Sequence, residues 1–193
     1  MSDLQKLAIK LFVEPGAVRP LADFIPVFHR WIQMHAVNGV LVDVADYSHV
    51  ESGPGVLLIG HEANYAIDVG GGRMGLLYSR KQPSEGGLAE RLARHARSAL
   101  TACRLLEQAP ELERQVRFRT GEVLIVANDR LLAPNTEETL AELRPALDDF
   151  LARLYGDARV TLERELDPKE RFAVTALADR SHDVDTLLAR LSS

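Results

Sequence analysis

The sequence of 193 residues contains a single cysteine, Cys103, and its longest apolar runs, such as GVLLIG and VLIVA, are short. One cysteine excludes an internal disulfide framework and a zinc site built on several cysteines. The apolar runs fall far short of the roughly 20 residues that a membrane-spanning helix needs. The N-terminus also lacks the basic start and apolar block of a signal peptide. We therefore expect a cytoplasmic protein that has no membrane partner.

The chain is also poor in net positive charge, because 28 acidic residues outnumber 23 Lys and Arg. A net charge of −5 argues against a nucleic-acid partner, whose phosphates require basic neutralisation. The charge is uneven, however: residues 73–104 hold seven basic and two acidic residues, and residues 135–193 hold thirteen acidic and eight basic ones. This basic segment could bind an anionic ligand or pair with the acidic end of the chain, and the sequence leaves both readings open.

Alternation and helical spacing of apolar residues predict an α+β fold. Strands are expected at 4–13, 39–44, 55–61, 64–69, 73–81, 121–128, 158–165 and 171–179. Helices are expected after Asp23, at 88–107, after Asn135 and at 183–191. Residues 39–44 are expected to form a short buried strand. The strands at 55–61 and 64–69 form a hairpin candidate, and the glycines at 70–72 predict a tight turn after it.

An internal repeat is visible when the sequence is shifted by 119 residues. Four identities then align without gaps, placing Pro15, Leu21, Ala22 and Pro26 on Pro134, Leu140, Ala141 and Pro145. The match predicts two tandem β-α-β-β-α units, residues 1–114 and 115–193, packed as two units or as one compact domain. The alternative is two unrelated α+β segments whose helices happen to share a phase. If the repeat is real, the first unit carries an inserted hairpin at about residues 45–72.

The inserted segment is the candidate functional region, because function often lies on additions to a rigid scaffold. Its polar residues and their basic neighbours form the predicted ligand-binding set: Asp46, His49, His61, Glu62, Tyr65, Asp68, Arg73 and Arg80. Several of these are metal-ligand types, but none of their spacings is diagnostic, and no metal is predicted. On a strand, His61 and Glu62 would point to opposite faces. The cofactor stays unknown.

Catalytic signatures are absent from the sequence. There is no Gly-x-Ser-x-Gly elbow, and Cys103 lies on the apolar stripe of a helix, where a buried inert thiol is expected. His95 lies on the same stripe and is interpreted as structural. The glycines before Arg73 lack the Gly-Lys-Ser/Thr ending of a phosphate-binding loop.

Two functional hypotheses remain. The favoured one is a non-enzymatic module that binds a small anionic ligand or a protein partner through the inserted hairpin. An exposed hairpin edge would also permit a homodimer, because an open edge can pair with another strand. The alternative is a small hydrolase, with or without a metal, centred on His61 and assisted by Asp46, His49 or Asp68.

Overall fold

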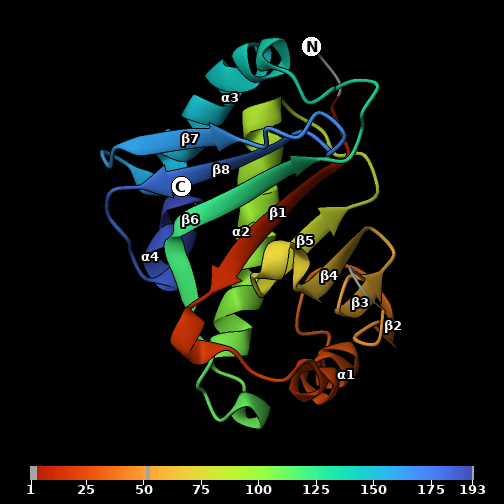
Figure 1. Cartoon of the computed structure of the whole chain (residues 1–193). Coiled ribbons are helices and arrows are strands. Elements are labelled where there is room, and N and C mark those ends of the chain that lie inside the picture. The colour runs from red at the N-terminus through yellow and green to blue at the C-terminus, as the bar shows by residue number, and fades with distance from the viewer. Residues whose placement is uncertain (1–3, 51–52, 193) are drawn as a thin grey trace.

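The computed structural model describes residues 4–50 and 53–192 and has an α+β architecture built on one eight-stranded antiparallel sheet (Figure 1). The strands lie in the order β2-β3-β4-β5-β1-β6-β8-β7. Their bounds are β1 Leu7–Val13, β2 Leu41–Asp46, β3 Val56–Gly60, β4 Ala63–Asp68, β5 Gly75–Arg80, β6 Phe118–Ala127, β7 Val160–Arg164 and β8 Ala173–Ala178. The predicted α+β class is confirmed.

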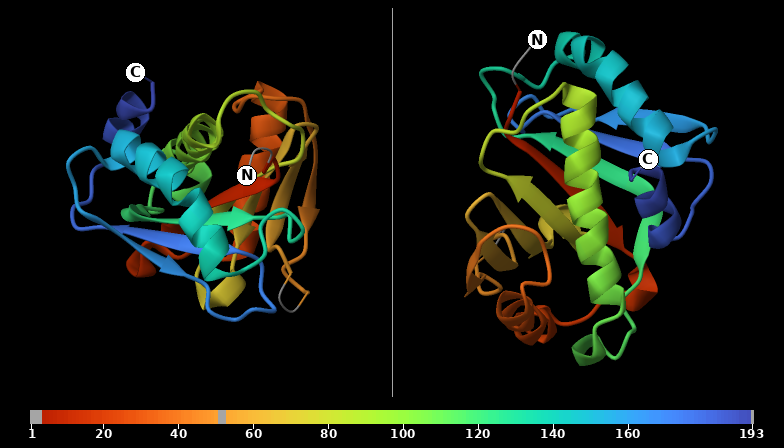
Figure 2. Two further views of the ribbon diagram at one scale, coloured as in Figure 1. Left: turned by 90° about the horizontal axis from the view of Figure 1, so that it is seen from above. Right: turned by 180° about the vertical axis from the view of Figure 1, so that it is seen from behind.

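The helices lie on one face of the sheet and leave the other face without a helical layer (Figure 2). They are α1 Phe24–Met34, α2 Leu88–Glu107, α3 Glu137–Tyr155 and α4 Val184–Arg190. Short 3-10 turns join the elements, among them η3 at Gly70–Gly72. Within the described ranges, no helix has both the length and the apolar character that crossing a membrane requires.

The two halves of the chain meet at the pairing of β1 with β6. The register places Ile9 opposite Ile125 and Leu11 opposite Val123, and every residue of β1 is buried. A strand buried on both faces reads as a continuous apolar run, and LAIKLFV fits that pattern except at Lys10. The predicted boundary at residues 114 and 115 therefore falls just before β6, the strand through which the second half of the chain joins a sheet shared by both halves.

Each helix packs on the sheet through an apolar stripe at helical spacing. In α1 the stripe is Phe24, Val27, Phe28 and Trp31, all essentially without solvent exposure. In α2 the stripe includes Cys103, and complete burial raises the pKa of its thiol. The predictions of a buried cysteine and of the helices after Asp23 and at 88–107 are thus confirmed.

The predicted hairpin exists, but it lies inside the sheet. Strand β3 pairs with β2 and β4, and β4 pairs with β3 and β5, so neither hairpin strand has a free edge. The edge strand on this side of the sheet is β2, whose side chains are exposed or half-buried. The prediction of a buried strand at 39–44 was therefore wrong.

The β2 edge also carries two features that hinder pairing with another strand. The register shifts at Val42, as in a β-bulge, and the Asp43 carboxylate accepts a hydrogen bond from Val44 N at 2.8 Å. Bulges and edge charges are common protections of exposed strands. The structure therefore gives no support to a homodimer through this edge.

The loop between β4 and β5 closes over the helix-free face and holds a buried lysine. Lys10 Nζ lies 2.5 Å from Asp68 Oδ2, and it donates to the carbonyls of Gly70 and Arg73 at 3.2 and 2.7 Å. Gly71 and Gly72 have φ values of 67° and 69°, which glycine adopts without the penalty of a side chain. The predicted tight glycine turn is confirmed, and the carbonyls of Gly70 and Arg73 at its two ends accept hydrogen bonds from Lys10.

The same loop bonds to the second half of the chain. The Arg73 guanidinium stacks on Phe12 at 3.8 Å from the ring centroid and forms two hydrogen bonds with the Glu122 carboxylate, at 2.6 and 2.7 Å. These bonds lower the pKa of Glu122. We call this set of residues, Lys10, Phe12, Asp68, Arg73 and Glu122, the loop clamp.

The loop clamp predicts a strongly coupled pair of mutations. Asp68→Asn should lower the free energy of unfolding by about 3 kcal/mol, because it leaves a buried ammonium without its counter-charge. In the Lys10→Met/Asp68→Asn double variant, the loss should be well below the sum of the two single losses. Urea unfolding measures all three variants.

A matched control is Arg144→Ala, which removes an exposed ion pair with Asp148 on α3 and should cost at most about 0.5 kcal/mol. Strictly additive losses at Lys10 and Asp68 would contradict the coupling.

Candidate functional site

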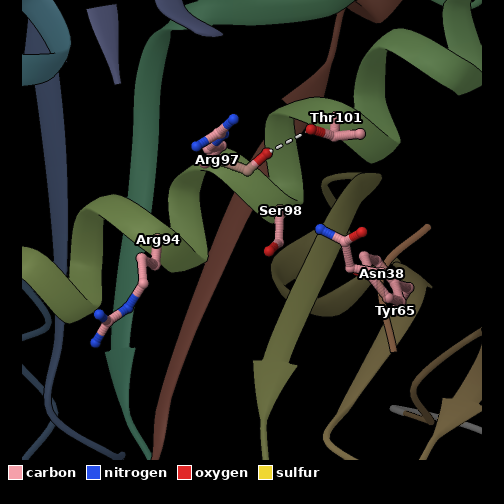
Figure 3. A pocket seen from close by; sticks show the side chains of 6 residues that line it. All are labelled: Asn38, Tyr65, Arg94, Arg97, Ser98 and Thr101. Carbon is pink, nitrogen blue, oxygen red and sulfur yellow. Dashed lines mark hydrogen bonds between the residues drawn. The ribbon is translucent and has the colours of Figure 1, made fainter. Parts of the chain in front are cut away.

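A cleft lies on the helical face of the sheet, between α2 and the ends of β4 and β5. It consists of two adjoining hollows of about 350 and 370 Å³ that share Asn38, Tyr65, Arg94 and Ser98. Figure 3 shows Arg94, Arg97, Ser98 and Thr101 on α2, with Asn38 and Tyr65 on the segments beside the helix. The inner hollow also reaches Gly39, Glu62, Ala63, Tyr78, Arg80, Ser84 and His95.

The cleft follows from how the first two helices divide the sheet. Helix α1 packs on β2 and β3, whereas α2 packs on β1 and β5. Strand β4 lies between these two pairs of strands, and its register places Tyr65 opposite Tyr78 and Ala63 opposite Arg80. The space left above this end of β4 and β5 forms the cleft.

A row of rings lies beneath the cleft. Trp31 of α1 meets Tyr65 with 6.3 Å between ring centroids, Tyr65 meets Tyr78 at 5.1 Å, and Tyr78 meets His95 of α2 at 5.6 Å. Tilted and edge-to-face contacts of this kind stabilise aromatic pairs beyond the area that they bury. Burial, with the neighbouring Tyr78, raises the pKa of Tyr65, whose phenol therefore stays protonated. The row gives the cleft a rigid floor.

Three arginines contribute positive charge to the cleft: Arg80 from β5, and Arg94 and Arg97 from α2. Arg80 Nε donates to the carbonyl of Gln82 at 3.0 Å, and Arg94 donates to the carbonyl of Glu85. Within the described residues, no carboxylate lies within 4 Å of any of these three guanidinium groups, although most ion pairs of the chain involve arginine. Their charges are therefore not neutralised by direct contact.

Glu62 is the acidic residue of the cleft. Its Oε2 accepts a hydrogen bond from the backbone N–H of Val40 at 3.1 Å, and this bond lowers the pKa of the carboxyl group. The bond attaches the hairpin turn to the segment that follows α1. The Glu62 carboxylate is thus ionised and already engaged with the backbone.

His95 is the most unusual residue of the cleft wall. The residue is 2% exposed, and neither Nδ1 nor Nε2 has a hydrogen-bond partner among the described residues. Burial, followed by the positive charges of Arg80, Arg94 and Arg91, lowers the pKa of His95 to about 4. A buried polar side chain without partners is rare in native proteins and requires an explanation.

The cleft brings together three of the eight predicted ligand-binding residues: Glu62, Tyr65 and Arg80. His61 and Glu62 form the turn between β3 and β4, so they do not alternate on a strand as expected. His61 is exposed, and its N–H donates to the carbonyl of Val40 at 2.8 Å.

The residues expected to assist His61 lie at the other end of the strands. Asp46 ends β2 opposite Val56 and accepts a hydrogen bond from Ser48 N at 2.8 Å, which contributes to lowering its pKa. His49 follows in the exposed loop after β2. Strands rise about 3.3 Å per residue, so the length of β3 separates these groups from His61. The proposed hydrolase constellation is not assembled.

Asp68 and Arg73 lie away from the cleft. Both belong to the loop clamp on the opposite face of the sheet, and their charges are satisfied by Lys10 and Glu122. The structure therefore does not place them with Arg80. Among the described residues, no three His, Cys, Asp or Glu side chains are gathered closely enough to hold a metal ion.

Sequence reasoning missed the contribution of α2. Five of its residues line the cleft (Arg94, His95, Arg97, Ser98 and Thr101), and the loops before β2 and α2 add Asn38 and Ser84. The available signal was the basic segment at 73–104, which includes these arginines. His95 gave no separate signal, because its place on an apolar stripe is the usual pattern of a core histidine.

Comparisons with known proteins give no further assignment: no protein-family model, curated protein or solved structure matches the chain.

The buried His95 predicts a loss of stability in mild acid. Above pH 6.5 the imidazole is neutral in the folded and unfolded states, so it has no effect on the pH dependence of stability. Between pH 6.5 and about 4 the unfolded chain binds a proton that the folded protein does not bind, and stability falls as the pH falls. The shift corresponds to about 3 kcal/mol at pH 4.

Urea unfolding at pH 7.5 and pH 4.5 of the natural protein and of His95→Gln measures this effect. The difference between the two proteins should change by about 2–3 kcal/mol over that interval, in favour of the variant at low pH. His29→Gln, at an exposed histidine, is the control and should leave the pH dependence unchanged. An equal pH dependence in the natural protein and His95→Gln would contradict the prediction.

Proposed function

We propose that this protein binds a small anionic ligand in the cleft between α2, the start of β4 and the end of β5. The observation that carries the proposal is the unneutralised group of arginines, Arg80, Arg94 and Arg97, beside a buried histidine that has no hydrogen-bond partner in the described part of the chain. Guanidinium groups are well suited to carboxylates and phosphates, because their N–H donors are planar and fixed in direction. Ser84 and Ser98 add hydroxyl donors at the same place.

The dimensions of the cleft favour a small molecule over a protein partner. The two hollows fall within the range of about 300–1,000 Å³ that is usual for small-molecule sites. The hairpin strands are paired on both sides and leave mainly their turn accessible. A protein partner through the hairpin would find little open backbone there.

The charge distribution also favours an external anion. Of the seven basic residues at 73–104, Arg73 pairs with Glu122 and Arg104 with Asp185, but the three cleft arginines have no such partner in the described structure. Pairing with acidic residues of the chain itself, of which only Asp185 belongs to the acidic end, therefore accounts for only part of the basic segment. A bound anion would supply the missing counter-charge.

We also infer that the chain consists of two β-α-β-β-α units and that the hairpin β3–β4 was added to the first. The strand order supports this, since β2-β5-β1 without the hairpin mirrors β7-β8-β6. The shift of 119 places Phe24, Phe28 and Trp31 on Leu143, Leu147 and Phe150, and all six side chains are buried. The added hairpin contributes Glu62, Ala63 and Tyr65 to the cleft.

Calorimetric titration of the full chain with sulfate and with inorganic phosphate, at constant ionic strength, tests anion binding. One saturable site is expected, and both Arg80→Ala and Arg94→Ala should weaken it at least tenfold, because each removes a charge-assisted donor. Arg144→Ala removes an equal charge from the exposed face of α3 and should leave the affinity unchanged. Absence of saturable binding, or equal weakening in Arg144→Ala, would contradict the proposal.

A further inference from the structure

His95 differs from an ordinary core histidine in lining the cleft while lacking hydrogen-bond partners. Its ring contacts Tyr78, and both ring nitrogens are buried without a partner in the described chain. A core histidine normally donates one ring N–H to a carbonyl or carboxylate. His95 lines a hollow that is large enough for a small oxyanion, and its two unpartnered nitrogens are buried beside that hollow's lining.

The groups around His95 are mostly positive or neutral. From its own helix it has Arg91 and Arg94, from β5 it has Tyr78 and Arg80, and the hairpin supplies Tyr65 and Glu62. Arg91 is itself buried, and its Nη1 donates to the carbonyl of Gly86 at 2.8 Å. The Glu62 carboxylate is engaged by Val40 N. In the unliganded cleft a second positive charge on the imidazole is therefore unfavourable.

We infer that His95 is the titrating hydrogen-bond donor of the anion site, and that a tetrahedral oxyanion of the sulfate or phosphate type binds there together with one proton, which His95 takes up. The proton comes from solvent and adds to the free imidazole nitrogen, and a ring N–H then donates to an oxygen of the ligand. No covalent bond of the ligand forms or breaks. This inference rests on the proposed anion-binding function.

The electrostatic coupling between the anion and the imidazole is reciprocal. The same positive charges that keep His95 neutral in the empty cleft attract the anion, and the bound anion offsets their effect on the imidazole. Neutral histidine has one donor nitrogen and one acceptor nitrogen, whereas its protonated form donates from both. An oxyanion has only acceptor oxygens, so it favours the protonated form. Affinity should therefore rise as the pH falls.

Sulfate is the decisive probe, because its own charge is constant between pH 5 and 8.5. Titration of the full chain in two buffers with different ionisation enthalpies gives the number of protons taken up on binding. We expect close to one proton in the interval between the pKa of His95 in the free protein and its raised value in the complex. The affinity should change about tenfold per pH unit where one full proton is taken up.

His95→Gln is the matched variant, since glutamine keeps a polar side chain but does not titrate. It should retain weaker sulfate binding that takes up no proton and shows no dependence on pH from this residue. Proton uptake that is equal in the natural protein and His95→Gln would overturn the inference. Sulfate binding without proton uptake in the natural protein would overturn it as well, while leaving the anion site itself intact.

Nitrogen-detected NMR of the histidine rings in the natural protein gives a readout that does not depend on a variant. Saturating sulfate should move the titration of His95 to higher pH by at least one unit, with His29 as the exposed control. An unchanged titration would overturn the role of His95. Failure of sulfate and phosphate to bind at any pH would instead refute the proposed function, and the inference with it.

Discussion

The pairing of β1 with β6 is the interaction on which the rest of the structure depends. These antiparallel strands join the two halves of the chain at the centre of the sheet, and the buried side chains of β1 contribute to both of its faces. Every other strand is added outward from this pair, and all four helices pack on the face that it defines (Figure 2). A slip of one residue in this register would exchange the two faces, so Lys10 would enter the apolar core.

The cleft and the loop clamp lie on opposite faces of the sheet, and both follow from helices covering only one of these faces. On the helical face, α1 and α2 occupy different strands and leave a gap above β4, where Tyr65 and His95 form part of the lining. On the other face, the loop after β4 provides the cover that no helix supplies, and it encloses Lys10. The start of β4 thus contributes to the polar cleft, whereas Asp68 at its end forms a structural ion pair with Lys10.

The sequence was sufficient to predict most elements of the fold, but only part of the site. Periodicity located the α2 stripe and the β3–β4 hairpin because both follow from local spacing. It failed for β2, since position at a sheet edge depends on pairing between distant segments, and residues 39–44, GVLVDV, are largely apolar. The separation of Asp68 and Arg73 from the cleft was not foreseen for a related reason: their partners, Lys10 and Glu122, are more than 45 residues away.

His95 could not have been identified as a site residue from its position alone. Its helical spacing is that of a core residue. Only the arrangement in space shows that its nitrogens, beside Arg80 and Arg94, have no partner among the residues that the structure describes. Lys10, in contrast, gave a usable signal. A lone lysine within LAIKLFV requires a buried counter-charge, because an ammonium group is almost never fully buried without one.

The position of the hairpin within the sheet has a consequence for strand direction. Because β3 and β4 form a pair, the direction of β2 relative to β5 is the same with the hairpin as it would be without it. An even number of strands can therefore be gained at this point without reversing the chain anywhere else. The outermost strand, with its bulge and its aspartate, remains the outermost strand. A hairpin placed between two existing strands would therefore enlarge the surface of a sheet without changing its edge strand.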